Sequence, residues 1–140
     1  MTAVELPSRT MKLIDRGIEA GIPWVTCRAP IYGAANGYVK IPEGHHWHGL
    51  DYNEIDVQAH GGLTYGGGES GWIGFDTLHS GDIWPAGPDH GPTPWDKHWT
   101  DELVAEETRA LARRVAAAAY ENAELSGAAA LSILAEDTQK

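Results

Sequence analysis

The stretch Trp-Val-Thr-Cys-Arg at residues 24–28 follows a Gly-Ile-Pro break and combines an aromatic ring with β-branched side chains, which predicts a β-strand. Three comparable segments follow it. Residues 38–41 end before a proline, residues 54–59 alternate polar and apolar side chains, and residues 72–76 carry Trp, Ile and Phe. A shorter strand is expected at residues 63–65. These segments predict a small, mostly antiparallel sheet.

Helices are expected on both sides of these strands. Residues 8–20 place Leu and Ile side chains at helical spacing, and Gly21 would end that helix. Thr100 is a good N-cap and precedes an apolar stripe that runs to about residue 125. A Ser-Gly pair would then break the helix before a short second one at residues 128–135. The sheet should therefore pack against N- and C-terminal helices.

Length and composition narrow the class of protein. We expect one α+β domain over residues 1–140, with a helical C-terminal part at residues 100–136. Ten Lys and Arg against twenty Asp and Glu give a net charge of -10, which disfavours binding to extended nucleic acid. The lone Cys27 excludes an intramolecular disulfide. Neither a signal peptide nor a run of roughly 20 apolar residues is visible, so a cytoplasmic protein without a membrane segment is expected.

Glycine and histidine gather in the middle of the chain, where all seven histidines lie between residues 45 and 98. His60 stands at an expected strand end and precedes Gly61 and Gly62, which permit positive φ angles and close approach to a ligand. Amides in such a turn can bind an anion, and the Thr64 hydroxyl would add a donor. The alternative is a glycine-rich hairpin in which His60 only caps the strand. An exposed loop is expected to hold His45, His46 and His48.

A second polar cluster, Asp76-x-x-His79-x-x-Asp82, follows the strand predicted at residues 72–76. Loops at strand ends present side chains to clefts. Asp76 would orient an imidazole, His79 would act as an acid or base, and Asp82 would bind a ribose hydroxyl or a metal. The alternative is an Asp-capped turn, because Ser, Gly and Asp all favour turns.

The sequence also bears on metal, thiol and aromatic chemistry. No established metal motif occurs, so no metal or other cofactor is expected, although the clustered His and Asp side chains offer nitrogen and oxygen ligands for a divalent ion. Cys27 lies in an apolar strand and is expected to be a buried hydrophobe rather than a nucleophile. Trp72 and Trp84 flank the polar clusters, where their rings would stack on a planar base.

Three blocks of this sequence stand out by their order and spacing: GYVKIPEGH at residues 37–45, DVQAHGGLTY at residues 56–65 and WIGFDTLHSGD at residues 72–82. Together they resemble a family of small, mostly uncharacterised proteins encoded by bacteriophages and their bacterial hosts. The likeness covers residues 24–125 and implies a viral or prophage origin without an assigned reaction. Family members often carry Cys where this chain has Thr77, so a nucleophile is not expected at that position.

By analogy with phage proteins that act on immune messengers, the resemblance implies interference with host signalling. We expect binding and cleavage of a small nucleotide messenger in the host cytoplasm, with His60 and His79 as base and acid and Asp76 as their orienting group. One alternative is a sponge that sequesters the nucleotide without cleaving it. Another is a structural or adaptor phage protein, and self-association stays open. The residues expected to hold the ligand are Gly61, Gly62, Thr64, Asp82, Trp72 and Trp84.

Overall fold

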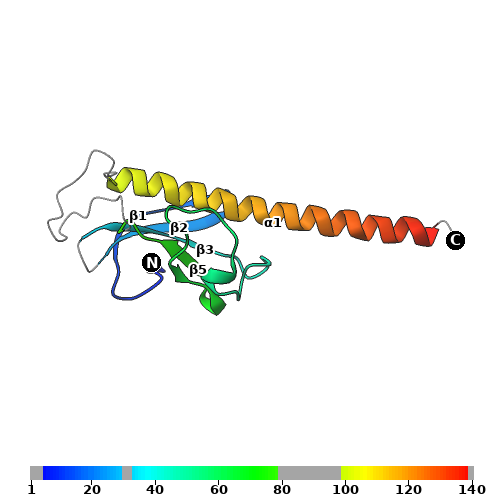
Figure 1. Cartoon of the computed structure of the whole chain (residues 1–140), viewed down its shortest axis with the longest axis horizontal. Coiled ribbons are helices and arrows are strands. Elements are labelled where there is room, and N and C mark those ends of the chain that lie inside the picture. Colours follow the sequence, from blue (N-terminus) through cyan, green and yellow to red (C-terminus); the bar gives the residue numbers. More distant parts are fainter. Residues whose placement is uncertain (1–4, 30–32, 79–98, 139–140) are drawn as a thin grey trace.

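The protein forms a five-stranded antiparallel sheet with one long helix across one face (Figure 1). The computed structural model describes residues 5–29, 33–78 and 99–138, with only the helical backbone beyond residue 119. The spatial order of the strands is β1-β2-β3-β5-β4. The elements are β1 (Lys12–Glu19), β2 (Ile22–Arg28), β3 (Ala35–Lys40), the short helix η1 (Tyr52–Glu54), β4 (Tyr65–Gly66), the short helix η2 (Gly68–Ser70), β5 (Trp72–Phe75) and α1 (Asp101–Thr138).

The helix-side core lies between α1 and the sheet. Alternate residues of the central strands, such as Val39 and Ile73, face Leu111 and Val115 of the helix. Burial of this apolar surface is the main force that docks α1, since a helix gains little stability from its own backbone. The predicted strands at residues 24–28, 38–41 and 72–76 are thus confirmed, with β3 starting earlier and ending one residue sooner than expected.

The start of α1 agrees with the predicted cap. The Leu103 N–H donates to the Thr100 hydroxyl at 3.1 Å, which satisfies one of the amides that have no partner inside a helix. The predicted break after residue 125 is wrong, because α1 continues without interruption to Thr138 and runs on beyond the sheet (Figure 1).

The predicted N-terminal helix is wrong, because residues 12–19 form the edge strand β1. A two-residue hairpin joins β1 to β2, and Ala20 and Gly21 adopt φ angles of 53° and 81° there. Positive φ at both positions fits the turn type that matches the twist of paired strands. Gly17 also lacks a Cβ, which would lie 2.8 Å from the Trp24 indole. The ladder with β2 therefore outweighs a short helical pattern that would be marginal by itself.

The strand predicted at residues 54–59 is also wrong. This segment lies outside the sheet and packs against the helix-side core through Ile55, Val57 and Ala59. Arg114 of α1 donates to the Gln58 carbonyl at 3.0 Å. The neighbour of β5 is instead β4, which overlaps the strand predicted at residues 63–65 at Tyr65. The polar–apolar alternation of residues 54–59 arises because one side of the segment packs against the core, although the segment pairs with no strand of the described chain.

The opposite face of the sheet, called here the outer face, carries a second apolar cluster. Val25, Cys27, Tyr38 and Trp72 are buried there, because Leu6, Met11 and Tyr65 pack over them. The chain before β1 therefore covers part of this face. Among the described residues, no helix is long and apolar enough to cross a membrane.

Candidate functional site

The His60–Thr64 segment forms a tight turn at the β4 edge of the sheet. The Gly62 N–H donates to the Ala59 carbonyl at 2.9 Å, and Gly61 and Gly62 adopt φ angles of 65° and 83°. Only glycine adopts such angles without strain, which explains the Gly-Gly pair. The predicted left-handed turn is therefore present, and the Thr64 side chain is exposed beside it.

Backbone pairing brings this turn alongside the end of β5. The Thr64 N–H donates to the Gly74 carbonyl at 2.9 Å, and the ladder continues through Tyr65 opposite Gly74. Asp76 follows β5 directly, so the two motifs belong to paired backbone segments at one end of the sheet. Pairing between β4 and β5, rather than proximity along the chain, produces this arrangement.

His60 is half-buried against an aromatic ring. Its imidazole lies 4.4 Å from the Trp99 ring, centroid to centroid, at an interplanar angle of 50°. Trp99 itself packs on the helix-side core, two residues before α1. The segment just before α1 therefore positions the imidazole through the Trp99 indole. The two residues are 39 positions apart, and no local pattern in the sequence pairs Trp99 with His60.

Internal hydrogen bonds occupy the Gly62 amide, which was expected to face a ligand, and the amide of Thr64. The Gly62 N–H and Thr64 N–H both donate to carbonyls of the chain. An anion at this turn would consequently depend on other groups, among them the exposed Thr64 hydroxyl and the His60 imidazole. This geometry favours a ligand held by side chains more than by a cradle of backbone amides.

Asp76 shapes the local backbone at the end of β5. Its carboxylate accepts the Leu78 N–H at 3.0 Å, as in the Asp-capped turn considered above. The Thr77 hydroxyl is buried and donates to the Ala35 carbonyl at 2.9 Å, so it is not presented as a nucleophile. Burial raises the pKa of Tyr38 to about 12, and the negative charge of Asp76 adds to that shift. Tyr38 is therefore a neutral phenol near this carboxylate.

The remaining predicted site residues differ in their placement. Trp72 is only 3% exposed and belongs to the outer-face cluster, so its ring is not open for stacking on a base. His79, Asp82 and Trp84 lie outside the described residues. Within the described ranges, no three His, Cys, Asp or Glu side chains gather in a way that could hold a metal ion.

His45 was expected in an exposed loop, and that prediction is wrong. The ring is 7% exposed, its Nε2 lies 2.8 Å from the Val115 carbonyl, and its Nδ1 accepts the Trp47 N–H at 3.0 Å. Because Nδ1 is an acceptor, the neutral Nε2–H tautomer satisfies both contacts. Burial lowers the pKa of His45, so the neutral form is favoured. His46 beside it is exposed, as predicted.

Cys27 should resist alkylation in the native protein. Its side chain is 1% exposed, and burial raises the pKa of the thiol to about 11. Since the thiolate is the reactive form, labelling by iodoacetamide at pH 8 should be at least about 100-fold slower in the native state than in urea. Intact-mass spectrometry over time measures both rates. Rapid native labelling would contradict the burial of this thiol.

No protein-family model, curated protein or solved structure matches this chain. The candidate site is therefore defined by its own geometry, as an end of the antiparallel sheet where the His60 turn contacts Trp99 and pairs with β5 at Gly74, two residues before Asp76.

Proposed function

We propose that this protein binds a small nucleotide messenger at the end of the sheet formed by the His60 turn and Asp76, and hydrolyses it in the host cytoplasm. The observation that carries the proposal is the His60 imidazole, held against Trp99 beside the strand end that Asp76 follows. An imidazole fixed by packing is suited to proton transfer, and we assign the Asp76 carboxylate to orient it.

The proposed reaction is hydrolysis of a phosphodiester bond. A water molecule attacks phosphorus while His60 takes its proton, and the bond from phosphorus to the leaving oxygen breaks. A second acid, assigned from the sequence to His79, donates a proton to that oxygen. Two imidazoles suit this chemistry near neutral pH because one can be neutral while the other is protonated.

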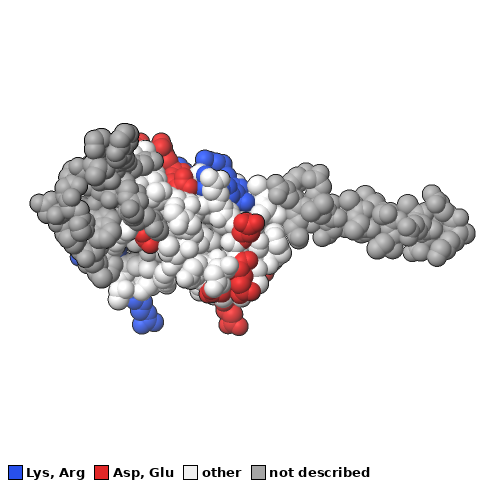
Figure 2. All heavy atoms as spheres, in the orientation of Figure 1, with Lys and Arg blue, Asp and Glu red and all other residues white. Residues whose placement is uncertain are grey.

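Charge supports a small ligand over a polynucleotide. The chain carries a net charge of -10, and on the face shown in Figure 2 the described Lys and Arg side chains form no continuous patch. Extended nucleic acid needs such a patch to neutralise its phosphates. The choice of an immune messenger as the ligand rests on the resemblance to phage proteins and is an analogy.

Replacing His60 by alanine should lower hydrolysis by about 100-fold or more. The assay mixes the protein with a panel of cyclic dinucleotides and ADP-ribose derivatives, with and without EDTA, and follows products by chromatography and mass spectrometry. The matched control is His46→Ala, which removes an exposed imidazole in another loop and should leave turnover unchanged.

Two outcomes would redirect or end the proposal. Depletion of a nucleotide that is recovered intact after denaturation would identify a sponge, and His60→Ala would then weaken binding instead of turnover. If no nucleotide in the panel is bound or converted, and His60→Ala changes only the melting temperature, a structural role replaces the proposed function.

A further inference from the structure

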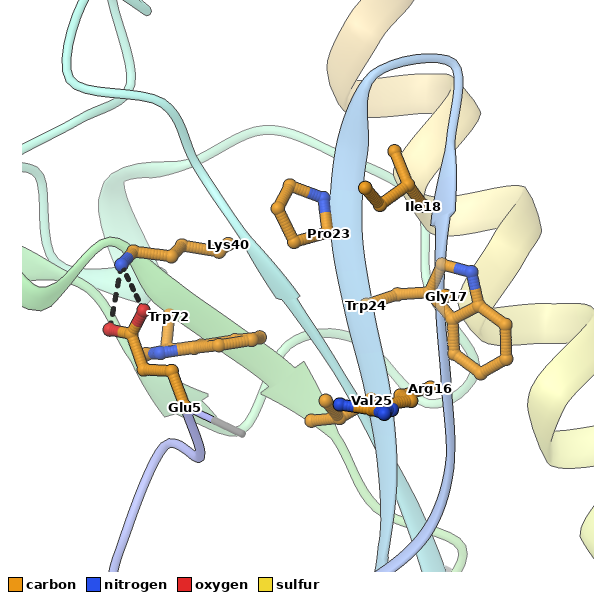
Figure 3. A pocket seen from close by; sticks show the side chains of 9 residues that line it. All are labelled: Glu5, Arg16, Gly17, Ile18, Pro23, Trp24, Val25, Lys40 and Trp72. Atoms are coloured by element: carbon orange, nitrogen blue, oxygen red, sulfur yellow. Dashed lines mark hydrogen bonds and ion pairs between the residues drawn. The ribbon is translucent and has the colours of Figure 1, made fainter. Parts of the chain in front are cut away.

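The outer face of the sheet contains an open hollow over residues of β1, β2, β3 and β5. It has a volume of about 490 Å³ and is walled by apolar side chains (Figure 3). Pro23 and Val25 of β2 line it together with Trp72 of β5 and Ile18 of β1. Ile18 is 73% exposed, the largest exposure among the large apolar side chains of the described chain. This volume is within the range of sites for small organic ligands.

One side of the hollow already binds a carboxylate. The Lys40 ammonium lies 2.6 Å from both oxygens of Glu5, and Figure 3 shows this pair beside the Trp72 ring. The hydrogen bond from Lys40 is the main reason that the pKa of Glu5 is lowered. The positive charge of Lys40 lowers it further, and desolvation acts in the opposite direction. The Glu5 carboxylate is therefore ionised and occupies the position that the carboxylate of a ligand would take.

The Trp72 indole N–H is a buried donor that has no acceptor among the described residues. It is buried and makes no hydrogen bond within the described structure, although it lies close enough to Glu5 to add slightly to the lowering of that pKa. A buried N–H without an acceptor costs free energy that a well-placed oxygen would recover. Lys40 and Trp72 thus form two converging donors for one carboxylate.

The Glu5 carboxylate is held only weakly at this position. The Glu5 side chain is 60% exposed and comes from the segment that precedes β1. An ion pair this exposed contributes little stability, so a competing anion can displace it. A second cation, Arg16, extends from β1 over Val25, its direct partner in the ladder (Figure 3). Within the described residues, its guanidinium makes no ion pair.

We propose that this hollow is a binding site for a small amphiphilic carboxylate, and that Glu5 occupies its anion position in the free protein. The ligand carboxylate would replace Glu5 at Lys40 and accept the Trp72 N–H, and its apolar body would cover Pro23, Val25 and Ile18. Arg16 adds positive potential at the rim. This site is on the outer face and is independent of the proposed nucleotide chemistry.

The experiment uses 1-naphthaleneacetate as the probe and its neutral isostere 1-naphthaleneacetamide as the matched ligand control. Titration of the full-length protein is followed by two-dimensional ¹H–¹⁵N spectra, with the Trp72 indole N–H as the reporter. The acetate should shift this resonance, and the amide should bind about tenfold more weakly, because it has no charge for Lys40.

Variants test whether Glu5 competes with the ligand for the Lys40 ammonium. Glu5→Gln should tighten binding of the acetate about fivefold, since it weakens the competing ion pair. Lys40→Gln should weaken it about tenfold. Glu106→Gln removes the same charge from the exposed side of α1 and should leave affinity within about twofold, because distant surface charges are screened.

The sign of the Glu5→Gln effect decides the outcome. Weaker or unchanged binding in that variant would overturn the proposal, since Glu5 would then be a structural contact and not an internal competitor. Equal affinity for the acetate and the amide, or no shift of the Trp72 resonance in either the natural chain or Glu5→Gln, would overturn it as well.

Discussion

Replacing Gly37 by alanine is expected to destabilise the protein by about 3 kcal/mol. Gly37 lies in the middle of β3, directly under α1. A Cβ at this position would overlap the Thr108 hydroxyl and lie 2.6 Å from the Phe75 ring. Neither neighbour can move easily, because both are fully buried.

The Thr108 hydroxyl is further fixed by its hydrogen bond to the Val104 carbonyl at 2.6 Å, one turn earlier in α1. The added methyl group would therefore push the helix away from the sheet. Chemical denaturation followed by far-UV circular dichroism measures the loss. Gly44→Ala is the matched control, since a Cβ there meets no atom within 4 Å. A cost below about 1 kcal/mol for Gly37→Ala would mean that α1 does not pack this closely.

Replacing His45 by alanine should cost about 3 kcal/mol at pH 7.5. The imidazole links the loop after β3 to the helix, through the Val115 carbonyl at Nε2 and the Trp47 N–H at Nδ1. The variant would leave both backbone groups without this partner and leave a void above the helix-side core. Urea denaturation at pH 7.5 measures the free energy of unfolding.

The same residue predicts a pH dependence with a definite sign. Burial lowers the pKa of His45 in the folded protein below the value of 6.5 in the unfolded chain. The unfolded state therefore binds a proton before the folded state does, and stability falls as the pH decreases below 6.5. Above that pH the contribution is fully present.

Unfolding measured at pH 7.5, 6.5 and 5.5 should show a decline that is shallower in His45→Ala than in the natural chain. His46→Ala serves as the control, because it removes an exposed neighbouring imidazole and should retain the steep dependence. Equal slopes in His45→Ala and the natural chain would show that His45 does not cause the loss at low pH.

Where the sequence predicted structure correctly, the deciding interactions are local. The segment at residues 24–28 and the last strand at residues 72–76 carry aromatic and β-branched side chains, which pack well on a pleated surface. Thr100 is followed by acidic residues and an apolar stripe, so the start of α1 could be recognised without knowledge of its partners. Such patterns depend on a few neighbouring residues only.

The errors arise where distant residues compete with a local pattern. Residues 12–19 show helical spacing, but the two-residue hairpin and the long ladder with β2 provide backbone hydrogen bonds that the spacing cannot reveal. His45 looks like a loop histidine along the chain, yet its partner Val115 is 70 residues away. Only the docking of α1 makes that imidazole buried and sensitive to pH.

The His60 turn depends both on its local sequence and on tertiary contacts. The sequence alone determined that His60 precedes a Gly-Gly pair and that the chain there turns with positive φ angles, since glycine is the residue that tolerates them. Tertiary structure decided that this turn pairs with β5 at Gly74, that Trp99 packs against the imidazole, and that the Gly62 and Thr64 amides donate to carbonyls of the chain. Strand pairing and helix docking join segments far apart in sequence, so the side-chain environment depends on contacts that no local pattern encodes.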